Sequence, residues 1–187
     1  MIKAIITDFD GTLVDTFEAN FCAYQEAFAC VGKTLTLERY RECFGYRFER
    51  FMSEMDINDA AQANVIKEVK KETYPKFFDC LYLNKALISL IETFKAMGVK
   101  TAIASTARKE NLMNAVTFLG IDKHFDLIFT GVDVKQGKPS PEIYLKAMKA
   151  LGVRPEETLI FEDSQVGIDA AKASGAQYMV VSEKQFK

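Results

Sequence analysis

The chain has 187 residues, of which 49% are hydrophobic and 27% charged, with a formal net charge of −2. This length and apolar content are enough to bury a substantial core. Basic and acidic residues are interspersed, so no basic face indicates a nucleic-acid partner, and no apolar run reaches membrane-spanning length. Because Met1 leads directly into an apolar segment rather than a signal peptide, we expect a cytoplasmic protein, monomeric or weakly homodimeric, without membrane partners.

The N-terminal segment carries two carboxylates where an apolar strand runs into a glycine turn. Side chains alternate along a strand, so Asp8 and Asp10 are expected to point the same way, with Phe9 packed behind and Gly11 turning the chain. One carboxylate can attack phosphorus while the other transfers protons. A bound metal and the close like charges would separate the two pKa values in the required direction. The alternative is a strand end whose aspartates only form Asx turns.

Apolar runs and helix-period segments alternate along the rest of the chain. This alternation predicts an α/β fold with a doubly wound parallel sheet, covered by helices on both faces. The predicted strands are Lys3–Thr7, Lys100–Ala104, Phe125–Thr130, Thr158–Phe161 and Gln177–Val181, and the predicted helices between them include Lys109–Leu119, Pro141–Leu151 and Gln165–Ser174.

Polar groups follow the second and fourth of these strands as well as the first. Ser105 and Thr106 offer hydroxyl and backbone N–H groups at an expected helix start, which suits a phosphate dianion, although an ordinary N-cap is the alternative. Glu162 and Asp163 end the fourth strand, and an oxygen-rich cluster facing Asp8 is what Mg²⁺ prefers. The alternative here is N-capping of the following helix by Asp163 or Ser164. Ligands of open α/β sheets bind beyond the carboxyl ends of strands, where all these residues fall.

Lys138 lies in a loop between the third and fourth strands. Two prolines, Pro139 and Pro141, stiffen this loop, so that it can aim the ammonium group at a bound phosphate. The alternative is a solvated surface lysine, which is what most lysines are. Only the polar motifs at the ends of the other strands favour a phosphate-binding role for Lys138.

These motifs together resemble those of the haloacid dehalogenase superfamily, in the order that the family requires. The matching segments are Asp8–Thr12, Ser105, Lys138 and Glu162–Ile168. Within the superfamily, the chain is similar to the β-phosphoglucomutase and phosphoglycolate phosphatase group, which carries a helical cap.

The resemblance implies a role for each matched residue. Asp8 would be the nucleophile and Asp10 the general acid and base. Mg²⁺ would be bound by the Asp8 carboxylate, the Asp10 carbonyl and Asp163, with Glu162 beside it. Ser105 and Lys138 would hold the phosphoryl group, next to Thr106, whose hydroxyl the residue pattern alone assigns to the phosphate. The implied sheet order places the first strand between the second and the fourth.

Residues 15–82 fit the cap, which leaves 1–14 and 83–187 for the Rossmann-like core. An aromatic stripe at three- and four-residue spacing, from Phe17 to Phe28, is expected to form the cap's own core rather than to stack on a ligand. Pro75 should end the last cap helix, and two short connections would let the cap close and exclude water. The expected cap helices are Phe17–Val31, Leu37–Phe44, Phe48–Met55 and Asp59–Tyr74.

Departures from the family pattern occur mainly in the cap. Asn20 stands where the mutase branch has a relay histidine, which argues against a mutase-type relay. The loop that contains Tyr46 and Arg47 resembles the mutase specificity loop, but its arginine is one residue out of register. Arg47 or Arg50 would reach an anionic substrate, with a solvated helix arginine as the alternative.

The sequence therefore predicts a Mg²⁺-dependent phosphatase that hydrolyses a small phosphorylated metabolite through an aspartyl phosphate. A sugar phosphate, phosphoglycolate or a nucleotide would each fit. One alternative is a phosphosugar mutase of the β-phosphoglucomutase type. Another is a phospho-accepting receiver domain for signalling, against which the chain length and the helical insert argue.

Overall fold

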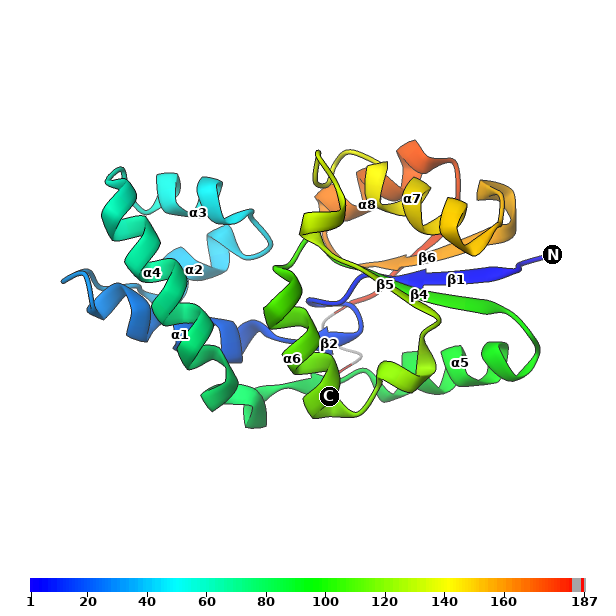
Figure 1. The fold of residues 1–187 in the computed structure, drawn as a ribbon, viewed down its shortest axis with the longest axis horizontal. Helices are drawn as coiled ribbons and strands as arrows, with labels where there is room; N and C mark the ends of the chain where they lie inside the picture. The colour runs from blue at the N-terminus through cyan, green and yellow to red at the C-terminus, as the bar shows by residue number, and fades with distance from the viewer. Residues whose placement is uncertain (183–185, 187) are drawn as a thin grey trace. The chain divides into compact units, whose positions relative to one another are not determined.

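A computed structural model describes residues 1–182 and 186 of the chain. It divides into two compact units, each of which is continuous in space (Figure 1). One unit comprises Met1–Asp15 and Tyr82–Lys187, and the other Thr16–Leu81. Within the described residues, no helix has the length and apolar character needed to cross a membrane.

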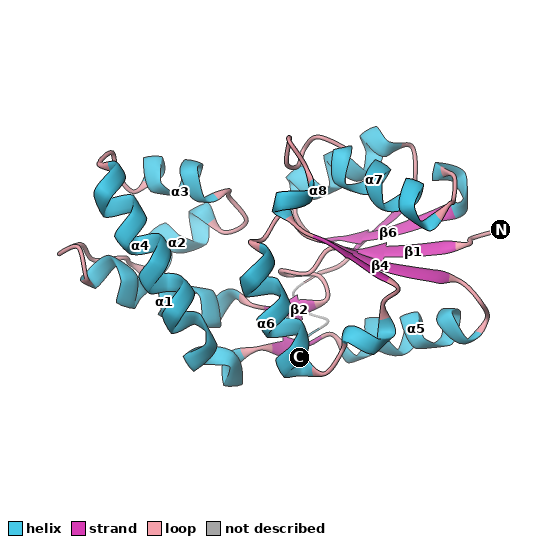
Figure 2. Ribbon diagram, in the orientation of Figure 1, coloured by secondary structure: helices cyan, strands magenta, loops and turns pink. Residues whose placement is uncertain are grey.

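A parallel sheet forms the centre of the first unit (Figure 2). β1 lies in the middle, between β4 and β6, as the resemblance implied. The register pairs Thr7 of β1 with Ile103 and Phe161, so the three central strands end at one edge of the sheet. In the described residues, the strand order is β5 (Leu127–Phe129), β4 (Lys100–Ala104), β1 (Ala4–Thr7), β6 (Thr158–Glu162) and β7 (Gln177–Val180).

Helices cover both faces of this sheet, so the predicted α/β class is confirmed. α7 (Glu142–Leu151) and α8 (Gln165–Ser174) lie on one face, and α5 (Lys85–Ala96) and α6 (Lys109–Leu119) lie on the other (Figure 1). Short 3₁₀ turns connect these elements, namely η2 (Asp122–His124), η3 (Gly131–Asp133) and η4 (Pro155–Glu157).

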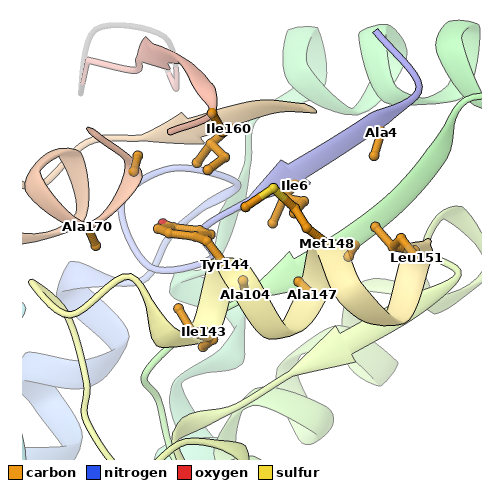
Figure 3. Packing of buried hydrophobic residues seen from close by; sticks show 13 residues of the cluster. Ala4, Ile6, Ala104, Ile143, Tyr144, Ala147, Met148, Leu151, Ile160 and Ala170 are labelled. Atoms are coloured by element: carbon orange, nitrogen blue, oxygen red, sulfur yellow. The ribbon is translucent and has the colours of Figure 1, made fainter. Parts of the chain in front are cut away.

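The core between the sheet and α7 combines small and branched strand residues with apolar side chains of the helix (Figure 3). Ala4 and Ala104 allow α7 to approach the sheet closely, while Ile6 and Ile160 fill the space between them. All four are fully buried. Burying one large aliphatic side chain contributes roughly 1.5–3 kcal/mol, so this layer fixes where α7 and its preceding loop sit.

A two-stranded ribbon lies where the sequence suggested plain connections. β2 (Val14–Asp15) pairs antiparallel with β3 (Tyr82–Leu83). Two-residue strands are too short to produce a detectable alternation of apolar and polar residues, which is why the sequence pattern did not reveal them. Next to the ribbon, Asn84 caps α5 by accepting from Leu87 N at 3.0 Å and donates to the carbonyl of Thr12 at 3.3 Å.

The second unit is helical throughout its regular structure. Its helices end within two residues of the predicted bounds, and Pro75 lies at the start of η1, directly after α4 has ended. The effect expected of this proline is therefore confirmed. The elements are α1 (Phe17–Ala29), α2 (Leu37–Cys43), α3 (Phe48–Glu54), α4 (Ala60–Thr73) and η1 (Tyr74–Cys80).

Aromatic side chains form the interior of this helical unit. Tyr40 is 4% exposed and lies at the centre of the group. Edge and tilted ring contacts of this kind stabilise a core beyond the burial of area alone. The stripe on α1 therefore packs within its own unit, as predicted. Ring centroids within 6.0 Å of that of Tyr40 belong to Phe17, Phe21, Tyr24, Phe44 and Phe51.

Candidate active site

The ends of β1 and β6 place three acidic residues together. Asp8 follows β1 directly, and its N–H donates to the carbonyl of Phe161 at 3.0 Å, which extends the strand pairing by one step. Glu162 is the last residue of β6, and Asp163 follows it. One carboxylate oxygen from each of Asp8, Glu162 and Asp163 lies within 4.8 Å of the others. The strand register alone thus brings two distant sequence motifs into one site.

Gly11 makes the turn after β1 compatible with this cluster. Its φ of +85° lies in the left-handed region, and a Cβ there would come within 2.3 Å of Asp163 Oδ2. Only glycine meets both conditions. Thr12, one residue on, donates its hydroxyl to Asp163 Oδ1 at 2.7 Å, so this turn also orients the Asp163 carboxylate.

Lys138 is buried and ion-paired rather than solvated. Its side chain is 5% exposed, and Nζ donates to Asp8 Oδ1 at 2.5 Å and to Glu162 Oε1. The loop before α7 therefore aims this ammonium between the ends of β1 and β6. The surface-lysine alternative is excluded by this burial.

Glu162 is completely buried, and hydrogen-bond donors surround it. Oε1 accepts from Lys138 and from the hydroxyl of Tyr144 at 2.6 Å. Oε2 accepts from the N–H groups of Asp163 at 3.0 Å and Ser164 at 3.3 Å and from the Ser164 hydroxyl at 3.2 Å. A Cβ on Gly167 would lie 1.9 Å from Oε1, so this glycine provides the space for the carboxylate.

The electrostatics of the site reflect burial and crowding of charge. Burial raises the pKa of Asp8 well above its ordinary value; Lys138 opposes this rise, and the Glu162 carboxylate adds to it. Burial also raises the pKa of Asp163 to about 6, against the hydrogen bond from Thr12. Burial disfavours the ammonium of Lys138, but Asp8 and Glu162 outweigh it and raise the Lys138 pKa. The site therefore sets the three carboxylates of Asp8, Glu162 and Asp163 against the one ammonium of Lys138, which leaves an excess of acidic groups.

These residues fit a hard divalent cation. The donors are carboxylate oxygens, which Mg²⁺ prefers, and the three acids converge closely enough to face one ion. The oxygens of Glu162 already accept five hydrogen bonds, so Asp8 and Asp163 retain more lone-pair capacity for a metal. A cation would also relieve the repulsion that raises the pKa of Asp8.

The second strand contributes a hydroxyl to the same edge. Ser105 is 2% exposed, and its Oγ lies 3.4 Å from Asp10 Oδ2, to which it donates. One expectation needs correction: α6 begins only at Lys109, so Ser105 and Thr106 precede the helix by several residues. The N–H of Ser105 is not available to a ligand, because it donates to the carbonyl of Phe129 at 3.1 Å in the sheet.

Thr106 lies in a loop that packs against η3. The N–H of Gly131 donates to the carbonyl of Ala107 at 3.0 Å, and a Cβ on Gly131 would lie 2.6 Å from the Thr106 carbonyl oxygen. The Ser105 hydroxyl accepts from the N–H of Ala107 at 3.1 Å. The end of β5 therefore holds the loop that follows β4.

The remaining predicted residues belong to the helical unit. Asn20 lies on α1 and is half-buried, and Arg47 is exposed just before α3. The guanidinium of Arg50 lies 3.8 Å from the ring centroid of Tyr46 and 3.9 Å from a carboxylate oxygen of Glu54. The charge of Arg50 is thus partly engaged, whereas Arg47 projects its charge into solvent.

Three residues at the site were not identified from the sequence. The helical periodicity assigns Tyr144 to the core, and in the sequence only its hydroxyl group indicates that it needs a polar partner. Gly131 and Gly167 are required by close approach of Thr106 and Glu162. The contacts of Tyr144 and Gly131 arise from the packing of segments far apart in the sequence, which a single sequence does not reveal, whereas Gly167 lies within the matched segment Glu162–Ile168.

A parallel sheet that gathers two aspartates, a hydroxyl and a buried lysine at its carboxyl edge defines an α/β enzyme built for phosphoryl groups. Comparison with known proteins agrees. The family model of haloacid dehalogenase-like hydrolases matches residues 5–181, and the chain belongs to this family. Both the resemblance stated from the motifs and the prediction of a hydrolase are confirmed, and the receiver-domain alternative is excluded.

Relatives within the family are phosphatases and phosphosugar enzymes. A phosphorylated carbohydrates phosphatase of Thermotoga maritima is 33% identical over 94% of this chain and 83% of its own. CbbY of Rhodobacter sphaeroides, solved with xylulose-(1,5)bisphosphate, is 29% identical with a TM-score of 0.87, over 97% and 87% of the two chains. A β-phosphoglucomutase of Clostridium difficile is 25% identical with a TM-score of 0.84, and the match covers 100% of this chain and 87% of the other.

Proposed function

We propose that the protein is a Mg²⁺-dependent phosphatase that hydrolyses a phosphorylated sugar or a similar small phosphomonoester through an aspartyl phosphate on Asp8. The observation that carries this proposal is the buried Lys138, which is hydrogen-bonded to Asp8 at 2.5 Å and also to Glu162. Burying an ammonium beside a carboxylate costs desolvation energy that the ion pair must offset, and an ammonium fixed in this way can stabilise negative charge on phosphoryl oxygens. The phosphorylated carbohydrates phosphatase and the CbbY structure that contains xylulose-(1,5)bisphosphate support the substrate class.

Each residue has a defined task in this reaction. Asp8 attacks phosphorus and forms the acyl phosphate, while Asp10 gives a proton to the leaving oxygen and later takes one from water. Lys138 and the Ser105 hydroxyl stabilise charge on the phosphoryl oxygens. Asp8, Asp163 and the Asp10 carbonyl would hold Mg²⁺, whose charge allows an anionic carboxylate to approach a phosphate.

We assign hydrolysis rather than isomerisation to the enzyme, because Asn20 replaces the histidine expected in the mutase relay. The similarity to β-phosphoglucomutases keeps the mutase as the second candidate. Incubation with β-glucose 1-phosphate, while free phosphate and isomerised sugar are followed together, separates the two. Faster isomerisation than phosphate release would favour the mutase.

The direct test of the proposed function is phosphate release from a panel of phosphomonoesters. Wild-type protein should release phosphate with Mg²⁺, lose this activity with a chelator and regain it when Mg²⁺ is restored. Asp8→Asn should reduce release to background without loss of folded structure, whereas Asp169→Asn, on the exposed side of α8, should leave it unchanged. Full activity of Asp8→Asn, or activity after exhaustive chelation, would contradict the proposal.

A further inference from the structure

Tyr144 connects the apolar core to the charged groups of the site. Its side chain is fully buried among the cluster residues under α7 (Figure 3). The hydroxyl is its only polar side-chain group, and it donates to Glu162 Oε1 at 2.6 Å. A buried tyrosine requires such a partner, and a charged acceptor makes the bond stronger than a neutral one.

The same side chain also contacts the lysine of the site. Lys138 Nζ lies 5.1 Å from the centroid of the Tyr144 ring, within the range of a cation–π interaction. Lys138 in turn donates to Glu162 and to Asp8. Tyr144 therefore touches both members of the ion pair that reaches the proposed nucleophile.

The geometry around Glu162 Oε1 leaves the carboxylate little freedom. Tyr144 and Lys138 provide its two donors, and the backbone at Gly167 lies close on another side, where even a Cβ would be only 1.9 Å away. If the tyrosine hydroxyl is removed, the negative charge on Oε1 is shared with Lys138 alone. The ammonium is then attracted more strongly to Glu162 and less to Asp8 and a bound phosphate.

We infer that Tyr144 is a positioning residue of this active site, which sets through Glu162 how far the Lys138 ammonium extends towards the transferring phosphoryl group. This inference rests on the proposed phosphatase function. Tyr144 does not touch the reacting atoms. Because the lysine stabilises charge that develops in the transition state, the residue should influence kcat more than KM.

The test is a double-mutant cycle between Tyr144→Phe and Glu162→Gln. Tyr144→Phe retains the ring and should lower kcat between about tenfold and a hundredfold, the range expected for losing a hydrogen bond to a charged group, with KM changed less than about twofold. In the Glu162→Gln background, the same substitution should change kcat by less than about twofold, because the charge through which it acts is absent. Met148→Leu, a conservative change in the same buried cluster, should leave kcat within about twofold.

Each outcome of the cycle has a defined meaning. Values of kcat are corrected for the folded fraction, measured by circular dichroism at the assay temperature, so that a partly destabilised variant remains informative. Unchanged kcat in Tyr144→Phe, an equal loss in both backgrounds, or a variant that does not fold at all would each overturn the inference. If wild-type protein releases no phosphate from any substrate of the panel, it is the proposed function that fails.

Discussion

At the residue scale, the two aspartates after β1 differ in their surroundings. Asp8 is buried and bonded to Lys138, whereas Asp10 is partly exposed and accepts from the Ser105 hydroxyl. A carboxylate next to a fixed ammonium is suited to attack on phosphorus, and a more accessible one can exchange protons with water and the leaving group. In the proposed mechanism, the same residue type would therefore serve two roles because the fold provides two environments.

Asp10→Asn should lower kcat by about 10²–10⁴-fold, the usual contribution of general acid–base catalysis. The amide cannot transfer a proton in either half of the reaction. Steady-state phosphate release gives the value, and a substrate with a good leaving group provides the control. That substrate needs no acid for the first step and should lose less rate in formation of the phosphoenzyme. Release of the leaving group during the first turnover isolates this step, and an equal loss there with both kinds of substrate would contradict the acid role of Asp10.

Asp126 provides a test of stability against pH away from the site. Although burial opposes it, hydrogen bonds from Lys95 and from the N–H of Thr101 lower its pKa below 3.8. A pKa lower in the folded than in the unfolded state stabilises the fold above the unfolded value, and this contribution is lost as pH falls through the folded value.

We therefore expect Asp126→Asn to lower Tm at pH 7 and to have a smaller effect below about pH 4. Thermal unfolding followed by circular dichroism between these pH values measures the difference. Asp169→Asn, an exposed helix position, serves as the reference for a simple change of charge. If the difference in Tm between wild type and Asp126→Asn grows as pH falls, folding does not lower the pKa of Asp126.

At the element scale, the loop after β4 depends on its neighbour after β5. Gly131→Ala introduces a Cβ that would lie 2.6 Å from the carbonyl oxygen of Thr106, so the loop that carries Ser105 must move. We expect kcat/KM to fall between about tenfold and a hundredfold, since displacements of about 1 Å are costly in catalysis. Val132→Ala, next to it and 71% exposed, should have little effect. Wild-type kcat/KM in a folded Gly131→Ala protein would refute this coupling.

Sequence patterns were sufficient for much of this arrangement at the element scale. Strand alternation and the order of motifs predicted that Asp8, Ser105 and Asp163 would meet at one sheet edge, because parallel strands share that edge. The burial of Lys138 and the role of Tyr144 depend on how α7 packs against β1 and β6. Such contacts between segments distant in sequence are not encoded in local periodicity or turn signals.

At the scale of the whole molecule, we expect catalysis and substrate selection to be divided between the two units. The α/β unit contains the carboxylates and the lysine, and we expect the helical unit to select the substrate. Arg47 is the better candidate there, because the guanidinium of Arg50 already stacks on Tyr46. A specificity residue acts on the part of the substrate that does not react.

Arg47→Ala should therefore raise KM for a sugar phosphate several-fold and leave KM for p-nitrophenyl phosphate, which lacks the hydroxyl groups of a sugar, nearly unchanged. A comparison of the two substrates in steady-state assays measures this, with Arg39→Ala as a control in the same unit, since Arg39 is ion-paired to Glu42. Equal effects of Arg47→Ala on both substrates, or none on either, would contradict a role in selection.

The central claim is that phosphate passes through Asp8. A rapid acid quench during a single turnover, followed by borohydride reduction, converts an aspartyl phosphate to homoserine, and peptide sequencing by mass spectrometry then locates it. Homoserine is expected at position 8; its formation should depend on substrate and Mg²⁺, and it should be absent from Asp8→Asn. Homoserine at position 10 or 163, or none at any time while phosphate is being released, would contradict an aspartyl phosphate on Asp8.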